Sequence, residues 1–353
     1  MLQRLLKLRQ AMAQAGLDGF LAWKPENRRY LSGFAGSHGA LLVTGTDAYL
    51  ITDNRYLEIA RQGCPDFTCV LQEGSIEATV ARLTAGVTHL GYEDDFLTVK
   101  GLATLQAAVT APALTPAAGL VERLRLYKDA TEVKSIRRAL QITERAYDEL
   151  LPVIRPGVKE ADLAVELEYY MRRLGAERIK ANFVLVSGPR AALPHGQATQ
   201  RVLEQGDFVT FDIGAIVDGY YSDFTRTVVL GKASQEQRKV YQTVLDAQLR
   251  ALDAIGPGKR GEELDRLARS IIGNAGYGDK FTHSLGHGVG LFIHEDPRLA
   301  PASPWVLEPG MIVTVEPGIY INGWGGVRIE DMVHITPGGC ENLTTAPKVL
   351  LEL

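Results

Sequence analysis

The sequence predicts an α+β protein built from two domains. Three observations lead to this prediction. The first third of the chain alternates between segments of helical and strand periodicity, the remainder carries its helices in pairs, and two long hairpins turn at an Asp-Gly or an Asn-Gly step. The length of 353 residues suits two domains of ordinary size.

Residues 1–122 predict an α/β domain with a mixed sheet. Apolar residues from Leu2 to Met12 lie at helical spacing and predict a first helix that Gly16 ends. DGFLAW follows as a strand, and GALLVTGTDAYLITD is typical of a hairpin with its turn at Gly-Thr-Asp. The alternation of helix and strand continues through RYLEIARQ, FTCVLQ, IEATVARL and HLGYE.

Residues 101–121 carry no charged side chain and could be mistaken for a membrane span. Pro112, Pro116 and Gln106, together with several threonines and alanines, make this run too polar to cross a bilayer. We therefore expect a helix that ends in a proline-rich connection, and no membrane partner.

The pattern changes near Glu122, so the second domain is expected to span residues 123–353. Asp129 and Glu132 have the spacing of a capping box at the start of a long charged helix. Four helices are expected, at 129–150, 159–174, 234–255 and 261–275. Together with the strand KANFVLVSG and two long hairpins, they predict an α+β domain around one strongly curved antiparallel sheet. The order helix, helix, hairpin occurs twice and indicates two related halves.

Four acidic residues lie on the arms of the two hairpins. Asp212 and Asp223 flank an Asp-Gly turn, and Glu316 and Glu330 flank an Asn-Gly turn. Because side chains alternate along a strand, the acid shares its face with another polar residue in three of these arms, while the opposite face is apolar. We therefore expect the apolar faces to pack on the helices and the carboxylates to gather on the other side.

Carboxylates that lie so close together repel one another unless they bind a proton or a cation. The glycine-rich stretch GHGVGLFIHEDP brings His287 as a nitrogen donor, because glycine lets a backbone approach a crowded site. Taken singly, each acid is more often a surface or turn residue. The joint placement of two Asp, two Glu and one His favours a metal site.

The composition excludes several classes of function. A net charge of −4 provides no basic surface for nucleic acid or for anionic lipid. Three scattered cysteines form no disulfide framework, which favours a reducing, cytoplasmic setting. The first residues carry charges throughout and do not form a signal peptide.

Four segments together resemble the "pita-bread" metallopeptidases of family M24, which include methionine aminopeptidase, aminopeptidase P and prolidase. These segments are FDIGAIVDGYYSDFTRTVVLG, HSLGHGVGLFIHEDP, MIVTVEPGIYI and GVRIEDMVHIT. The match covers roughly residues 123–350 and implies the pita-bread fold for the second domain. The pieces RYLSGFAGS and TDNRY resemble the N-terminal domain of aminopeptidase P, which implies a creatinase-like first domain.

The resemblance also implies a metal centre. Its ligands would be Asp212, Asp223, His287, Glu316 and Glu330, which hold two divalent ions with Asp223 and Glu330 as bridges. Four carboxylates and one imidazole favour a hard ion such as Mn²⁺, although Zn²⁺, Co²⁺ or Fe²⁺ would also fit. Two such ions lower the pKa of a shared water molecule.

Further residues receive catalytic roles from the same resemblance. His195, in LPHGQAT, and His294, in IHEDP, match substrate-facing histidines that would stabilise the oxyanion as hydrogen-bond donors. Glu316 is the candidate for moving a proton from water to the leaving nitrogen. Arg328 is expected to orient Glu330 or another bridging acid, with an ordinary surface arginine as the alternative.

The substrate pocket is expected to accept a proline after the scissile bond, which has no N–H and a fixed φ. The candidates for its lining are His195, His283, Phe292, His294 and Tyr320. The peptide substrate would therefore carry proline at its second position.

Within the family, the first domain favours an Xaa-Pro aminopeptidase (aminopeptidase P), and the alternative is an Xaa-Pro dipeptidase (prolidase). A dipeptidase needs a positive group for the carboxylate after the proline, whereas an aminopeptidase needs an open path for the chain. By analogy we expect a homodimer, in which Arg28, Arg29 or Arg55 of a neighbouring first domain could reach the site. A metal-binding scaffold without catalysis is disfavoured because both substrate-facing histidines are present.

Overall fold

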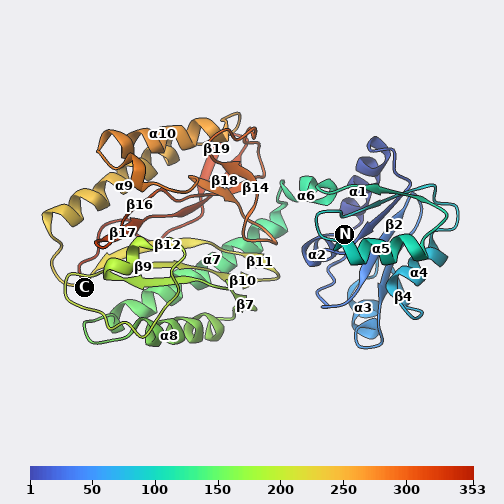
Figure 1. The fold of residues 1–353 in the computed structure, drawn as a ribbon, viewed down its shortest axis with the longest axis horizontal. Coiled ribbons are helices and arrows are strands. Elements are labelled where there is room, and N and C mark those ends of the chain that lie inside the picture. Colours follow the sequence, from blue (N-terminus) through green and yellow to red (C-terminus); the bar gives the residue numbers. More distant parts are fainter. The chain divides into compact units, whose positions relative to one another are not determined.

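The computed structural model describes all residues, 1–353, and divides into two compact units. Unit 1 spans Met1–Arg125 and unit 2 spans Leu126–Leu353. A hydrophobic cluster lies within each unit, so each part buries apolar surface of its own. The ribbon in Figure 1 shows their elements by label.

Unit 1 contains a single sheet of mixed direction, as the sequence predicts. The strand order is β4-β3-β2-β1-β5-β6, in which β2 is antiparallel to both β1 and β3 and the other pairs are parallel. The strands are β1 Gly19–Ala22, β2 Ala40–Thr44, β3 Ala48–Thr52, β4 Thr68–Leu71, β5 His89–Tyr92 and β6 Ala113–Pro116. The helices are α1 Leu2–Gln14, α2 Pro25–Ser32, α3 Leu57–Gly63, α4 Ile76–Leu83, α5 Val99–Ala108 and α6 Leu120–Arg125.

Two features of unit 1 differ from the sequence prediction. The proline-rich connection contains strand β6, which pairs in parallel with β5 at the edge of the sheet. An edge strand tolerates Pro116 because a missing N–H there interrupts no central ladder. Helix α1 buries Leu5, Leu8 and Met12 but leaves Leu2 exposed, so its apolar face is narrower than the leucine pattern suggests.

The four long helices of unit 2 form where the sequence predicts them. They are α7 Ala130–Leu150, α8 Glu160–Arg173, α9 Gln235–Ala254 and α10 Gly261–Asn274. The capping box at the start of α7 is confirmed: the Asp129 side chain accepts from the backbone of Glu132, whose side chain accepts from the backbone of Asp129. Short 3-10 turns lie at Leu151–Val153, Gly188–Ala192 and Gly278–Lys280. None of the helices has the length and apolarity that a membrane span requires.

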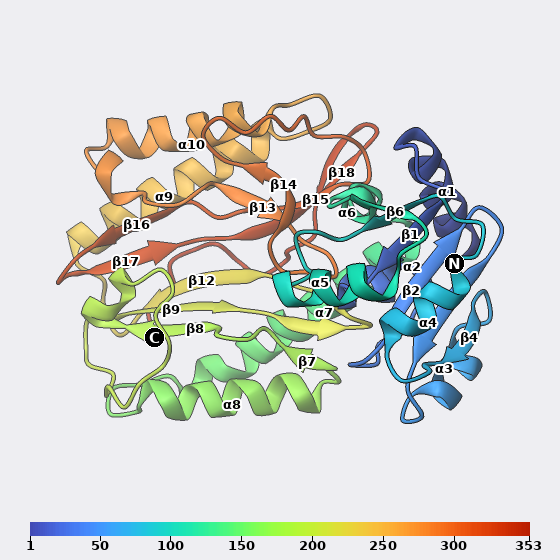
Figure 2. The same ribbon diagram turned by 45° about the vertical axis from the view of Figure 1, so that its right-hand side comes forward.

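The strands of unit 2 pair only in antiparallel fashion, which agrees with the predicted α+β class. They are β7 Arg178–Ile179, β8 Val184–Ser187, β9 Phe208–Ile213, β10 Ala215–Val217, β11 Tyr220–Tyr221, β12 Phe224–Val229, β13 Gly286–Gly288, β14 Glu295–Leu299, β15 Ile312–Val315, β16 Gly318–Ile321, β17 Gly325–Arg328, β18 Asp331–Thr336 and β19 Gly339–Asn342. Figures 1 and 2 show that these strands lie between two helical layers, α7 with α8 and α9 with α10.

The predicted strand KANFVLVSG forms only in part. Strand β8 begins at Val184, and the two-residue β7 ends at Ile179. Asn182, between them, has φ 56°, a left-handed conformation that extended pairing does not allow. Lys180 therefore lies between β7 and the turn at Asn182, and not within a strand.

Two hairpins carry the functional candidates. The first pairs β9 with β12, placing Asp212 opposite Thr225, and turns at Asp218 and Gly219, which both have positive φ as a tight hairpin turn requires. The second places β16 against β17 and β15 against β18. A backbone bond of 3.2 Å from the N–H of Glu330 to the carbonyl of Thr225 joins the two hairpins.

Candidate metal centre and pocket

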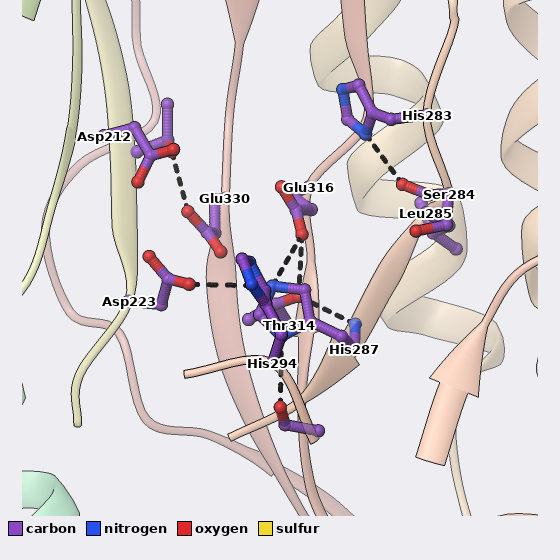
Figure 3. Close-up of polar contacts among 12 residues, drawn as sticks. Asp212, Asp223, His283, Ser284, Leu285, His287, His294, Thr314, Glu316 and Glu330 are labelled. Atoms are coloured by element: carbon purple, nitrogen blue, oxygen red, sulfur yellow. Dashed lines mark hydrogen bonds and ion pairs between the residues drawn. The ribbon is translucent and has the colours of Figure 1, made fainter. Parts of the chain in front are cut away.

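The structure brings the five predicted ligands together from five places in the chain. Asp212 lies near the end of β9, Asp223 just before β12, Glu316 just after β15, and Glu330 between β17 and β18. His287 comes from the middle of β13. Figure 3 shows their side chains directed toward one shared space.

Glu330 is common to two groups of donors. Its carboxylate forms one group with Asp212 and Asp223 and another with His287 and Glu316, and within each group one donor atom per residue lies within 4.8 Å of the others. This arrangement matches a cluster in which one carboxylate reaches two adjacent cation positions.

His287 offers one nitrogen to this cluster. Its Nδ1 lies 3.1 Å from the carbonyl oxygen of Gly288, which can only accept, so Nδ1 carries the proton. Its Nε2 lies 3.2 Å from Oε1 of Glu316 and 3.6 Å from Oδ2 of Asp223. A backbone bond that fixes the tautomer in this way is typical of a histidine ligand.

The glycines around His287 have a steric reason. A Cβ atom at Gly286 would overlap the carbonyl oxygen of Thr314 in the neighbouring strand β15. A Cβ atom at Gly288 would overlap the carbonyl oxygen of Asp296 in β14. The backbone that carries His287 thus packs too closely between its neighbours for any larger residue, as the sequence suggested.

Burial and the repulsion between neighbouring carboxylates disfavour the ionised form of some acids in the cluster. Burial raises the pKa of Glu330 well above its usual value, and the charges of Asp223 and Glu316 add to the shift. Burial also raises the pKa of Asp223 to about 6, although Lys180 opposes this shift. For Glu316, the hydrogen bond and charge of His287 outweigh burial and lower the pKa to about 2.

An unpaired oxygen shows that the residues fit a cation. Oε2 of Glu330 accepts a hydrogen bond of 2.7 Å from Thr225, but its Oε1 is buried and has no hydrogen-bond partner. A buried carboxylate oxygen without a hydrogen-bond partner raises the free energy of the folded state, and a bound cation would provide the missing partner. The oxygen-rich donor set with one imidazole suits hard divalent ions.

Metal binding is expected to weaken as the pH falls through about 6. Asp223 and Glu330 have raised pKa values, so an incoming ion must displace their protons at acidic pH. We expect the Kd for Mn²⁺ to be at least about tenfold higher at about pH 5 than at about pH 8. Isothermal titration calorimetry in buffers of different ionisation enthalpy measures both the Kd and the released protons. Equal affinity at both pH values, without proton release, would contradict this expectation.

Arg328 contacts a different acid from the one that the sequence suggested. It donates to Oδ2 of Asp212 at 2.6 Å, to the hydroxyl of Tyr320 at 2.7 Å and to Oγ1 of Thr225 at 3.2 Å, and it is 2% exposed. No hydrogen bond or ion pair joins Arg328 to Glu330; both side chains instead bond to Oγ1 of Thr225. Arg328 is thus a buried residue that fixes Asp212, and not a surface arginine.

A cavity of about 660 Å³ opens beside the cluster. Of the predicted substrate residues, His195, His283, Phe292 and His294 line it. Tyr320 does not line it: its hydroxyl lies behind, 2.8 Å from Nε2 of His283 and bonded to Arg328. The structure therefore places Tyr320 as a support for two residues that do reach the cavity.

His294 lies against the predicted ligand His287, with ring centroids 4.4 Å apart and the rings nearly perpendicular. Burial, followed by the charges of His287 and Lys180, lowers the pKa of His294 to about 4. The imidazole is consequently neutral at pH 7 and can donate one hydrogen bond into the cavity.

Several residues that the sequence did not point to also line the cavity, among them Lys180, Asn182 and Arg298. Lys180 was not identified because a lysine at the start of a predicted strand is usually a solvent-exposed residue. Arg298 follows His294 by four residues, and this proximity is the one signal that could have pointed to it.

Two family models match the chain. Metallopeptidase family M24 matches residues 134–337, and the creatinase/prolidase N-terminal domain matches residues 4–127. Among individual proteins, an Xaa-Pro dipeptidase of Pyrococcus furiosus is 37% identical over 99% of this chain and 100% of its own length.

Two solved structures are also similar over nearly their whole length. An Xaa-Pro dipeptidase from Bacillus anthracis has a TM-score of 0.97 and 45% identity, and the match covers 100% of this chain and 99% of that one. An X-Pro aminopeptidase from Thermotoga maritima has a TM-score of 0.90 and 36% identity, with 98% and 100% covered. Proteins named for either activity therefore share this architecture.

Proposed function

The chain belongs to metallopeptidase family M24, and on this premise we propose that it is an Xaa-Pro peptidase, which hydrolyses the bond between an N-terminal residue and a following proline. The observation that carries the proposal is the convergence of four carboxylates and His287 beside a cavity that His294 lines. Relatives named Xaa-Pro peptidases support the choice of substrate.

The metal centre would be held by Asp212, Asp223, His287, Glu316 and Glu330. Two divalent ions there, with Mn²⁺ as the first candidate, would polarise the scissile carbonyl and make a water molecule more acidic. Arg328 would keep one carboxylate oxygen of Asp212 fixed in direction.

Glu316 would move the proton in this reaction. Its side chain lines the cavity and accepts a hydrogen bond of 3.1 Å from Thr314. An ionised carboxylate can take a proton from the attacking water and pass it to the proline nitrogen, which must be protonated to leave as an amine. The neutral His294 would donate to the carbonyl oxygen as negative charge develops there.

Of the two activities, we favour the dipeptidase over the aminopeptidase that the first domain suggested. Arg298 lines the cavity, donates a hydrogen bond of 3.2 Å to the carbonyl of His294, and has no carboxylate within ion-pair distance. A dipeptide ends in a carboxylate directly after its proline, which is the anion that such an arginine can bind. The aminopeptidase is the second candidate, because His195 and Phe292 at the cavity are exposed and leave room for a longer chain.

We expect Ala-Pro to be cleaved with a higher kcat/KM than Ala-Pro-Ala, and both activities to be lost with a chelator. Arg298→Met should lower kcat/KM for Ala-Pro by about 10- to 100-fold, mainly through KM, because a hydrogen bond to a charged group contributes about 1.5–3 kcal/mol. Release of free alanine measures both.

Ala-Pro amide is the matched control substrate, since it lacks the carboxylate and should not respond to Arg298→Met. Arg250→Met, on an exposed arginine of α9, is the control variant. Preference for the tripeptide, with no effect of Arg298→Met, would assign an aminopeptidase. If metal is bound but neither peptide is cleaved, the protein would be a metal-binding scaffold without catalytic activity.

We extend the proposal to a homodimer, which the resemblance to Xaa-Pro peptidases implies. Of the three arginines considered for contact with a neighbouring copy, Arg28 is buried within unit 1 and donates to the carbonyl of Gly39. Arg55 keeps an exposed side chain, so it is the better candidate of these two.

A further inference from the structure

Lys180 reaches into the candidate metal centre. Its backbone N–H donates to the carbonyl of Gly214 at 2.8 Å, which fixes the lysine beside the end of β9. Its ammonium group contacts Oδ1 of Asp212 and lies 2.6 Å from Oδ1 of Asp223. The side chain is 11% exposed, so this is a largely buried cation shared by two acids.

Both contacted acids belong to the donor group that also contains Glu330. A divalent ion bound to Oδ1 of Asp212 or of Asp223 would lie within a few ångströms of the ammonium nitrogen. Two cations at that separation in a poorly solvated site repel strongly. Lys180 and a metal ion therefore cannot occupy these oxygens together.

The contacts of Asp212 indicate which of its two cationic partners, Arg328 or Lys180, a metal ion would displace. Its Oδ2 accepts from Arg328 and its Oδ1 from Lys180, so both oxygens are already engaged. Arg328 is buried and also bonded to Tyr320 and Thr225, which hold it in place. Lys180 has no partners for its ammonium group besides the two acids, and it lines the cavity into which a flexible side chain can turn.

We propose that Lys180 is an internal counter-cation that competes with metal for Asp212 and Asp223 and turns into the substrate cavity when metal binds. The inference rests on the proposed metal centre and adds a control of its affinity by one residue of this chain. Lysine suits this role because its single charge is carried on a long, flexible stem.

Lys180→Met tests the competition, because methionine keeps the apolar stem and removes the charge. We expect the Kd of the chelator-treated protein for Mn²⁺ to fall by at least about tenfold, which corresponds to about 1.4 kcal/mol. The Tm of the chelator-treated variant should lie below that of the wild type, since two carboxylates lose their cation, and Mn²⁺ should raise it by more. Lys232→Met, at an exposed lysine after β12, should change neither quantity.

Displacement has a separate readout. Acetylation of lysines by a soluble active ester, followed by mass spectrometry, should label Lys180 weakly in the chelator-treated protein and more strongly after Mn²⁺ is added. Labelling of Lys232 should stay the same in both conditions.

An unchanged or higher Kd in Lys180→Met would overturn the inference, as would labelling of Lys180 that does not respond to Mn²⁺. Hydrolysis of Ala-Pro is measured on the same samples and separates this result from the proposed function. Equal Mn²⁺ affinity with full hydrolysis refutes only the role of Lys180. Absence of Mn²⁺ binding in both proteins refutes the metal centre and the inference together.

Discussion

His287→Ala is expected to release bound metal and to lower kcat/KM for an Xaa-Pro substrate by at least about 10³-fold, since the Lewis acidity of the ions contributes several kcal/mol. His287 is the one nitrogen donor among the five proposed ligands, and its Nε2 faces both Glu316 and Asp223. Alanine would remove this donor and leave the carboxylates with their mutual repulsion. Metal content after gel filtration and steady-state kinetics measure the two effects.

A matched control is His334→Ala, on strand β18, which removes a partly buried histidine from outside the donor groups. It should retain metal and activity. Thermal unfolding of both variants in chelator separates loss of the ligand from loss of the fold. A His287→Ala protein with its full metal content and normal turnover would refute the ligand assignment.

Local patterns in the sequence were sufficient for most elements of unit 2. The capping box of α7 and the hairpin turn at Asp218 depend on residues only a few positions apart, and both form as predicted. Strand alternation likewise placed Asp212 on one face of β9, because the period of a strand fixes the side on which each residue lies. These features need no knowledge of distant contacts.

Contacts between distant segments could not be predicted in the same way. Alternation assigns a face but not a partner, so the pairing of Arg328 with Asp212, 116 residues away, required the folded structure. The approach of Lys180 to the cluster depends on the bend at Asn182, where the apparent strand is interrupted. Strand β6 was missed for a related reason, since its pairing with β5 outweighs the local effect of Pro116.

His294→Ala is expected to lower kcat by about 10²- to 10³-fold while the metal content stays the same, which is the usual effect of removing one donor to a developing oxyanion. His294 lines the cavity and is neutral at pH 7, because burial lowers its pKa to about 4. Its contribution to kcat should therefore be constant between about pH 6 and pH 8, and loss by protonation should appear only as the pH falls toward that pKa. Steady-state kinetics across this range and metal analysis provide the measurement.

The donor atoms of His294 also lie in one group with those of Asp223 and His287, so the same variant distinguishes two roles. A ligand would take metal with it when it is removed, as expected for His287→Ala. A donor to the substrate leaves the metal bound and affects turnover alone. His294→Gln sharpens the distinction, because an amide N–H can replace the imidazole donor in part, whereas it is a poor substitute for a nitrogen ligand. Partial recovery of kcat in His294→Gln at full metal content would support the donor, and loss of metal in both variants would make His294 a ligand.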